Sequence, residues 1–202
     1  MSAPYQLVES LHAHDGPIRC AAIGPSGEIV TGCQSDAPNF RVWRREGLEL
    51  REVGTPVYHD HWVVAITSLG ADPGRAYCPE GLIITGCQDT QIRLFSALGV
   101  PLGILAGHSK GVISFSWTRT PSTAITSTST TPLLISGSWD GTARIWDLER
   151  GTCVCELGGH ENGVQVLGLP NGQVATTSTG ESVNGKPANF KLRLWEWESG
   201  ES

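Results

Sequence analysis

The fold of this chain is decided between Gly107-His108 and Asp147. The most informative part of that stretch reads Ser136-Gly137-Ser138-Trp139-Asp140-Gly141-Thr142-Ala143-Arg144-Ile145-Trp146-Asp147. A His opens the phrase, a turn of small and acidic residues lies in the middle, and a Trp-Asp pair ends it. Asp140-Gly141 is typical of a tight hairpin turn. Alternating and β-branched residues around it predict strands near Leu133–Ser138 and Thr142–Asp147, between further strands near Gly111–Thr118 and Thr152–Leu157.

The same phrase recurs four times along the 202 residues. Its copies open at His14, His59, His108 and His160, and they close at Trp43, Phe95, Trp146 and Trp195. Both sets of residues are spaced by 45 to 52 positions, so two independent anchors give the same period. We expect repeats at about 12–53, 57–105, 106–157 and 158–198, each with four short strands.

This pattern resembles the WD-repeat β-propeller family over nearly the whole chain, and most clearly in the third repeat. The resemblance implies one all-β domain over 1–202, with four blades that belong to a seven-bladed ring continuing beyond Ser202. In the alternative, four blades close on themselves or pair with a second chain. In such propellers the first strand usually completes the last blade, and residues 5–11 are expected to do so.

The recurring polar residues have a structural role in such blades. We expect each His to bond the Asp of the following turn, with a strand hydroxyl and the closing Trp N–H extending the network. Its expected members are His14, His59, His108, His160, Asp36, Asp89, Asp140, Trp43, Trp146 and Trp195. The competing interpretation is a Ser-His-Asp hydrolase. Recurrence argues against it, because a catalytic triad is needed once. We therefore predict no enzyme and no cofactor.

Composition limits the partners. With 14 Lys and Arg against 20 Asp and Glu, the formal charge of −6 gives no electrostatic support to nucleic-acid binding. The N-terminus lacks the pattern of a secretory signal, and no apolar run approaches the roughly 20 residues that span a bilayer. We expect no membrane partner and a location in the cytoplasm, the nucleus or both. For the six Cys, structural thiols are favoured over a metal site or disulfides.

One face of the propeller is expected to bind a partner, because the loops that precede the first strand and join the middle strands of each blade share that face. Trp62 and Trp139 stand out, since neither occupies the closing Trp position. Exposed aromatic residues near a propeller mouth suit a protein partner; the alternative is that each packs between blades. The expected binding residues are Arg19, Ser35, Trp62, Gln88, Ile113, Trp139 and Gln165.

One branch of the family is especially similar. Tyr5-Gln6-Leu7 with Leu11-His12-Ala13-His14, and above all Ser138-Trp139-Asp140-Gly141-Thr142-Ala143, resemble the phospholipase A(2)-activating protein family. That resemblance implies a non-catalytic propeller that binds ubiquitin in a degradation pathway, and docking of a valosin-containing-protein-type unfoldase through domains absent from this chain. The alternative is a generic WD-repeat scaffold or substrate receptor with another protein partner.

Overall fold

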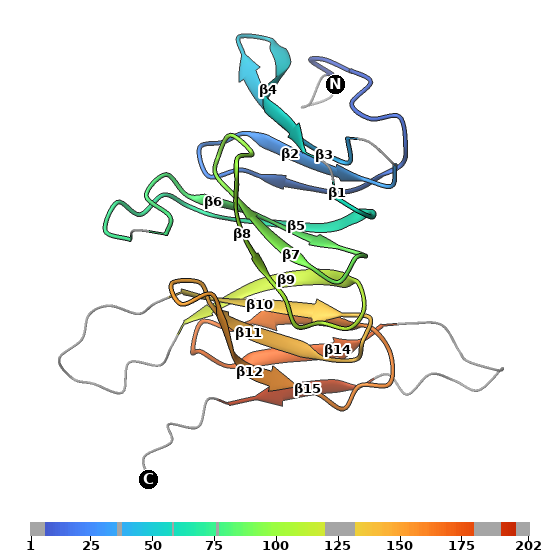
Figure 1. Ribbon diagram of the computed structural model, residues 1–202, viewed down its shortest axis with the longest axis vertical. Coiled ribbons are helices and arrows are strands. Elements are labelled where there is room, and N and C mark those ends of the chain that lie inside the picture. Colours follow the sequence, from blue (N-terminus) through green and yellow to red (C-terminus); the bar gives the residue numbers. More distant parts are fainter. Residues whose placement is uncertain are drawn as a thin grey trace, which may run out of the picture.

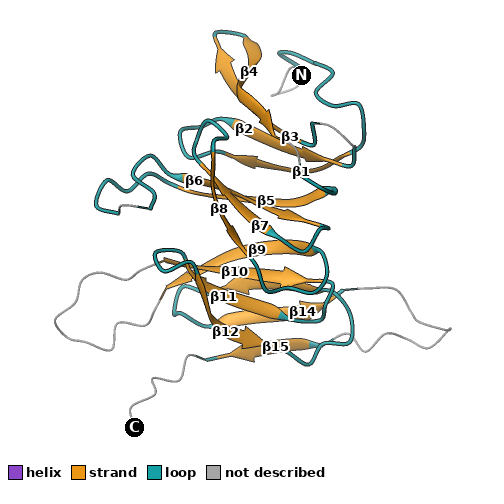
Figure 2. Ribbon diagram, viewed as in Figure 1, coloured by secondary structure: helices purple, strands orange, loops and turns teal. Residues whose placement is uncertain are grey.

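Short strands dominate the computed structural model, which describes residues 7–35, 38–57, 59–75, 77–119, 132–179 and 191–196. Within these ranges the chain forms fifteen strands, arranged in four antiparallel sheets (Figures 1 and 2). The same ranges contain no helix of the length and apolar character that crossing a membrane requires.

Each sheet is a meander of strands that follow one another along the chain, and we refer to the sheets as blades 1 to 4. Blade 1 contains β1 (Ile18–Ile23), β2 (Ile29–Cys33), β3 (Phe40–Glu46) and β4 (Glu49–Val57). Blade 2 contains β5 (Val63–Leu69), β6 (Leu82–Cys87), β7 (Ile92–Phe95) and β8 (Pro101–Leu105). Blade 3 contains β9 (Val112–Arg119), β10 (Pro132–Ser138), β11 (Ala143–Asp147) and β12 (Thr152–Leu157). Blade 4 contains β13 (Val164–Gly168), β14 (Val174–Ser178) and β15 (Leu192–Trp195).

The third repeat confirms the strand prediction, since β9 to β12 begin and end within one residue of the expected bounds. The turn after β10 has the expected chemistry. Gly141 has a positive φ of 84°, and the N–H of Ser138 donates to the carbonyl of Thr142 at 3.1 Å. Glycine adopts this conformation without a steric penalty, which explains why Asp-Gly marks the hairpin. The all-β propeller prediction is therefore confirmed.

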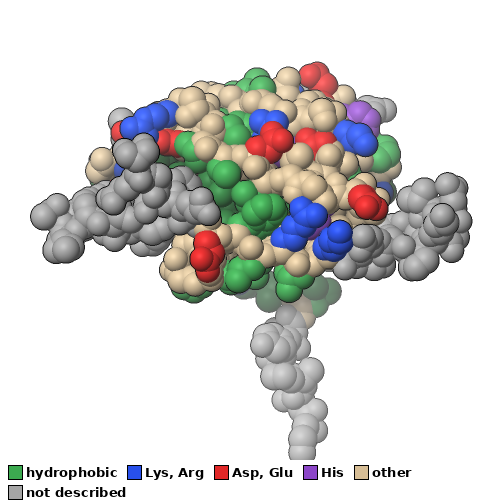
Figure 3. All heavy atoms as spheres, turned by 90° about the horizontal axis from the view of Figure 1, so that it is seen from below, with side chains coloured by type: hydrophobic (Ala, Val, Ile, Leu, Met, Phe, Trp, Pro, Cys, Tyr) green, Lys and Arg blue, Asp and Glu red, His purple; other side chains and the backbone are tan. Residues whose placement is uncertain are grey.

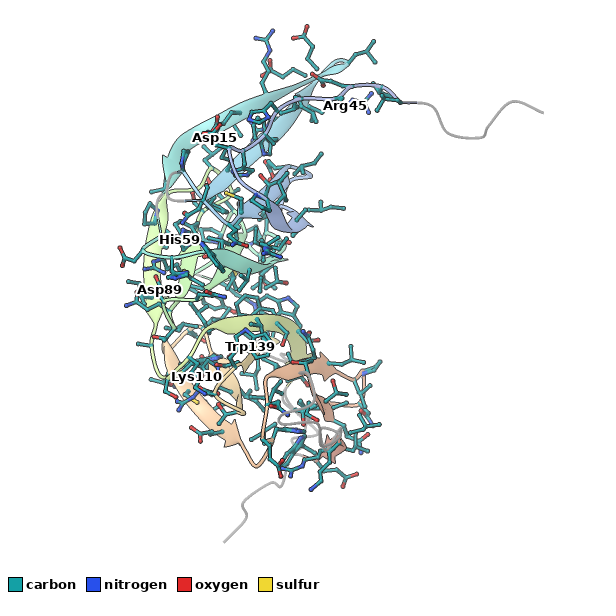
Figure 4. All side chains as sticks on the ribbon, turned by 90° about the vertical axis from the view of Figure 1, so that its right-hand side faces the viewer. Asp15, Arg45, His59, Asp89, Lys110 and Trp139 are labelled. Carbon is teal, nitrogen blue, oxygen red and sulfur yellow. The ribbon has the colours of Figure 1, made fainter. Side chains whose placement is uncertain are left out.

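The four blades follow one another along an open arc (Figure 4). Neighbouring first strands contact each other, β1 with β5, β5 with β9 and β9 with β13, so these strands line the inside of the arc. We call the surface of a blade that points toward the next blade its trailing face, and the opposite surface its leading face. Side chains alternate along β6: Ile83 packs against blade 1, and Ile84 packs against blade 3.

Each pair of consecutive blades shares an apolar core. The trailing face of blade 1 contributes Phe40 and Val42, which pack with Val63 and Ile83 of blade 2. The corresponding cores between blades 2 and 3 and between blades 3 and 4 follow the same plan. A large aliphatic side chain buried in this way contributes about 1.5–3 kcal/mol, so the arc is held mainly by these interfaces.

That residues 5–11 complete the last blade stays a prediction. Residues 7–11 form no strand, and the backbone N–H of Leu50 in β4 donates to the Glu9 carboxylate at 2.6 Å. The segment therefore lies beside blade 1. Blade 4 is at the opposite end of the arc (Figure 1). Residues 5 and 6 lie outside the described residues.

Candidate protein-interaction site

A hydrogen-bonded network recurs inside every blade. The Nε2 atom of each repeat His lies 2.7–2.8 Å from a hydroxyl of the second strand. The pairs are His14 with Thr31, His59 with Thr85, His108 with Ser136 and His160 with Thr176. In blades 1, 3 and 4 the indole N–H of Trp43, Trp146 or Trp195 donates to the same hydroxyl at 2.8–2.9 Å. Buried polar groups are thereby satisfied together.

The bond from His to the turn Asp forms in blade 3 and not in blade 2. His108 Nδ1 lies 2.9 Å from Asp140 Oδ2, which also accepts the N–H of Ser109 at 2.9 Å. In blade 2 the carboxylate of Asp89 forms an ion pair with Arg93 at 2.7 Å instead. The ring of His59 packs near Phe95, which closes blade 2 in place of Trp, and near Phe40 of blade 1. Asp36 lies outside the described residues.

The contacts among Ser136, His108 and Asp140 in blade 3 form a buried structural network and not a catalytic triad. His108 contacts both Ser136 and Asp140, which is the order of contacts in a hydrolase triad. Ser136 is fully buried, however, and its Oγ also accepts the indole N–H of Trp146. A substrate carbonyl has no route to this hydroxyl. Burial also lowers the pKa of His108, against the opposing effect of Asp140.

The mouth is the face of the arc that carries the turns after β2, β6 and β10. Figure 4 looks onto this face, where Asp89, Lys110 and Trp139 lie on blades 2 and 3. Trp139 has 43% of its surface exposed. One edge of its indole packs on blade 4, since a Cβ built on Gly163 would lie 2.4 Å from Cε3 of the ring. Both sequence interpretations thus apply to Trp139: one edge packs between blades, and the rest of the ring faces solvent.

Trp62 is half-buried on the same face. Its backbone N–H donates to Nδ1 of His61 at 2.9 Å, and the two rings lie 5.0 Å apart between centroids. The carbonyl of Trp62 accepts the N–H of Gln88 at 3.0 Å, as the carbonyl of Gly111 accepts that of Trp139. This backbone bond identifies equivalent mouth positions in different blades.

The structure places Gln34, and not Ser35, at the position of Gln88 and Trp139. The N–H of Gln34 donates to the carbonyl of Pro17 at 2.9 Å, the bond that marks this position. The sequence predicted Ser35 because it directly precedes Asp36, but the connection between the second and third strands is longer in blade 1 than in blades 2 and 3. Ser35 is half-buried, with its Oγ 2.9 Å from Cys33 Sγ. Arg19 belongs to this part of the mouth, since its Nε donates to Gln34 Oε1 at 2.7 Å.

Gln165 does not lie on the mouth. The first strands of blades 1 to 3 each contain a β-bulge, and the extra residues are Arg19, Val64 and Ile113. Strand β13 has no bulge, and Gln165 pairs with Thr177 in regular register. Gln165 therefore occupies the position of Ser114, on the trailing face, where it is exposed at the end of the arc. Val64 is the mouth residue that sequence reasoning missed in blade 2. A bulge cannot be seen in one strand without its partner.

The thiols are not grouped into a site. All six Cys are free, and Cys33 and Cys87 are buried as expected. Burial raises the pKa of Cys87 to about 12, so its thiol stays protonated and donates to the carbonyl of His61 at 3.0 Å. Within the described ranges no three His, Cys, Asp or Glu side chains are placed to hold a metal ion.

Comparison with known sequences places these repeats in a family. The family model described as "WD domain, G-beta repeat" matches residues 5–44 and 99–147. A ribosome biogenesis protein WDR12 homolog of Drosophila persimilis is 26% identical over 145 residues, which are 69% of this chain and 29% of that protein. Phospholipase A-2-activating protein of Xenopus laevis is 31% identical over 164 residues, 77% of this chain and 18% of that protein. Protein DOA1 of Saccharomyces cerevisiae is 26% identical over 167 residues, 79% and 19% of the two chains.

Solved structures show the same fold. The WD40 β-propeller domain of Doa1 superposes with a TM-score of 0.64 at 22% identity, covering 96% of this chain and 56% of that one. U3-55K superposes with a TM-score of 0.64 at 18% identity, covering 92% and 50%. The chain thus spans less than a third of the three curated relatives and about half of the solved propellers. The matched repeats and the four blades identify the chain as a WD40-repeat protein with the β-propeller fold.

Proposed function

We propose that this WD40 propeller is a non-catalytic protein-interaction module that binds ubiquitin or ubiquitinated proteins on its mouth. The proposal places it in a degradation pathway that uses an unfoldase and the proteasome. The similarity to phospholipase A-2-activating protein and to protein DOA1 supports it, as does the resemblance of the sequence around Trp139 to the phospholipase A(2)-activating protein family. The exposed indole of Trp139 is the observation that carries it.

The mouth has the composition of a binding surface. The mouth carries an aromatic anchor, Trp139 of blade 3, together with polar side chains that include Gln88 of blade 2 and the Arg19–Gln34 pair of blade 1. Trp139 is held in place by its contact with Gly163, so little side-chain entropy is lost when a partner covers it. Aromatic anchors within a polar rim typically carry most of the energy of protein association.

The rest of the proposal follows from composition and resemblance. A valosin-containing-protein-type unfoldase enters it only through domains outside these 202 residues. The net charge of −6 supports a protein partner over nucleic acid, and we propose no membrane partner and a location in the cytoplasm or nucleus. No catalytic role is assigned to the blade networks, because their hydroxyls are buried.

Titration of isotope-labelled ubiquitin with the 202-residue chain, followed by NMR, tests this function. We expect chemical-shift changes that saturate, and a Trp139→Ala variant that binds at least about thirtyfold more weakly, as for an interface hot spot. Leu102→Ala is the matched control, because Leu102 is an exposed apolar side chain on β8 away from the mouth. Unchanged spectra at millimolar concentration would contradict ubiquitin binding.

A second candidate is a WD40 scaffold for a different protein. The match to a ribosome biogenesis protein and the equal TM-score of U3-55K favour it, because this fold serves many assemblies. Affinity purification distinguishes the two candidates. Recovery of one other stoichiometric complex, lost in Trp139→Ala and free of ubiquitin, would support the scaffold and keep the mouth as the binding site.

A further inference from the structure

The outer strand of blade 2 exposes a row of apolar side chains. Strand β8 lies at the outer edge of its sheet, since the order in blade 2 is β5-β6-β7-β8 and β5 lines the inside of the arc. Leu98 and Val100, in the turn before β8, are 44% and 55% exposed, and Leu102 and Ile104 of the strand are each 56% exposed. Residues 96–106 contain no charged side chain. Contiguous exposed apolar surfaces typically mark interaction sites.

Blade 3 has an acidic residue where the outer strand of blade 2 has an apolar one. In blade 3, Glu156 pairs with Arg144 and forms an ion pair with it at 2.5 Å. Ile104 occupies the same register position in blade 2, opposite Arg93. The Arg93 guanidinium forms its ion pair at 2.7 Å with Asp89, in the turn after β6. The charge of Arg93 is therefore paired without an acidic residue on the outer strand.

The turn before the outer strand differs in the same way. In blade 3 the N–H of Glu149 donates to Asp147 Oδ1 at 2.9 Å. In blade 2 the N–H of Leu98 donates to Ser96 Oγ at 3.3 Å, so Leu98 stands where blade 3 has an exposed Glu. Figure 3, which views the molecule from the blade 4 end, shows Lys, Arg, Asp and Glu side chains spread among the hydrophobic ones. The outer edge of blade 2 lacks this mixture.

The outer strands of blades 1 and 3 carry charges that protect their edges. Strand β4 contains Glu49, Arg51 and Glu52, and β12 contains Glu156. Charged side chains of this kind keep an edge strand from pairing with a strand of another molecule. Pairing of β4 or β12 with its own copy would also bring acidic side chains of both molecules into one interface. Strand β8 has no charge to repel its copy, and Pro101, which lacks an N–H, stands at its first position, where a strand tolerates proline.

We propose that the outer edge of blade 2 pairs with the same edge of a second copy of this chain. Strand β8 of each copy lies antiparallel to β8 of the other across a two-fold axis, so the two blades form one continuous sheet. The exposed apolar side chains of the two copies then pack on one another. The contact lies on the outer circumference of the arc, so it is compatible with a ring of any number of blades.

The surface available suits a weak dimer. A specific interface buries about 1,000 Å² in total at the low end, or about 500 Å² on each copy. Four half-exposed aliphatic side chains and the backbone of one strand supply roughly that area. Gly103 leaves room for a side chain of the second copy, because the nearest atom to its Cβ position is Leu94 Cδ1 at 3.9 Å. Residues 93–95 and 101–104 line a hollow of about 290 Å³ there.

Sedimentation velocity of the 202-residue chain over a range of concentrations tests the dimer. We expect a species of twice 21.6 kDa that dissociates on dilution and is stabilised by added salt, since the contact is apolar and each copy has a charge of −6. Ile104→Glu should weaken dimerisation at least about tenfold, because it gives β8 the charged edge of blade 3. Glu156 shows that a blade accommodates Glu at this position, and circular dichroism verifies the fold. Leu48→Glu adds the same charge at an exposed residue of blade 1 and is the control that stays dimeric.

Hydrogen exchange identifies the strand that makes the contact. Amide hydrogens of residues 102–105 should exchange more slowly as the concentration rises, while those of β4 and β12 keep their rates. Leu98→Glu is a second variant that should weaken the dimer, and it changes a turn residue outside the strand. A monomer at every concentration, a dimer retained by both Ile104→Glu and Leu98→Glu, or slower exchange at another edge in place of β8 would each overturn the proposal.

Discussion

The indole of Trp139 lies against Gly163 of the next blade, with no space for a side chain between them. A Cβ on Gly163 would fall 2.4 Å from Cε3 and 2.7 Å from Cζ3 of the ring. The mouth aromatic of blade 3 is therefore positioned by blade 4, and a change at residue 163 should act on binding without touching the partner.

Gly163→Ala should displace the indole, because overpacking at this site is relieved only if the ring moves. We expect a loss of about 1–3 kcal/mol in stability and a weaker mouth interaction. Thermal unfolding and tryptophan fluorescence measure the two effects. Gly158→Ala is the matched control, since nothing lies within 4 Å of its Cβ position. An unchanged fluorescence spectrum in Gly163→Ala would contradict the contact.

Stability should fall as the pH drops from 6.5 toward 4. Burial lowers the pKa of His59 from 6.5 to about 4, so the unfolded chain takes up a proton in this window and the folded chain does not. The stabilisation is complete above pH 6.5 and is lost on acidification; for His59 alone it amounts to about 2 kcal/mol between pH 7.5 and 5. Urea unfolding at these two pH values measures it. His59→Gln should show a smaller pH dependence, and an equal dependence would count against this assignment.

Asn39→Ala should destabilise the junction between blades 1 and 2. The Asn39 amide donates to the carbonyls of His59 and His61 at 3.0 and 2.9 Å, and its Oδ1 accepts the N–H of His59 at 2.9 Å. Asn39 is buried, so its removal leaves backbone groups unpaired at a cost of about 3 kcal/mol. Urea unfolding checks this against Asn171→Ala, which alters an exposed Asn in a turn. Similar stabilities for the two variants would argue against a stabilising role of the Asn39 hydrogen bonds.

Thr90→Gly should stabilise the protein by about 1 kcal/mol. Thr90 has a φ of 78°, a conformation that a β-branched residue adopts only with strain. Blade 3 has Gly141 at the corresponding turn position, with a φ of 84°. Thermal unfolding measures the gain, and Thr142→Gly, in a neighbouring turn, should destabilise instead because the Thr142 hydroxyl donates to Asp140 at 2.7 Å. A destabilised Thr90→Gly would mean that Thr90 makes a compensating contact.

The repeats and the strands of blade 3 could be predicted from the sequence, because the period and the Asp-Gly turn are local patterns. The contacts of each repeat His and closing Trp with a strand hydroxyl could also be predicted, because these residues recur with the same period. The register of the strands could not be predicted, because it depends on the partner strand. Strand β9 has a bulge and β13 has none, so Gln165 lies at the end of the arc and not on the mouth. Asp89 forms an ion pair with Arg93 and does not bond His59. This could not be predicted, because the Arg93 guanidinium becomes a neighbour of the carboxylate only in the folded blade.

Among the described residues the main contacts between blades join neighbouring blades, so blades 1 and 4 each pack on one blade where blades 2 and 3 each pack on two. In a one-dimensional stack of this kind, local opening costs less where fewer interfaces must break. Amide hydrogens at the two ends of the arc should therefore exchange with solvent sooner than those of β6 and β10, and calorimetry should show a broadened transition. The molecule then frays inward from its ends, and a bound partner that bridges the blades would slow this exchange throughout.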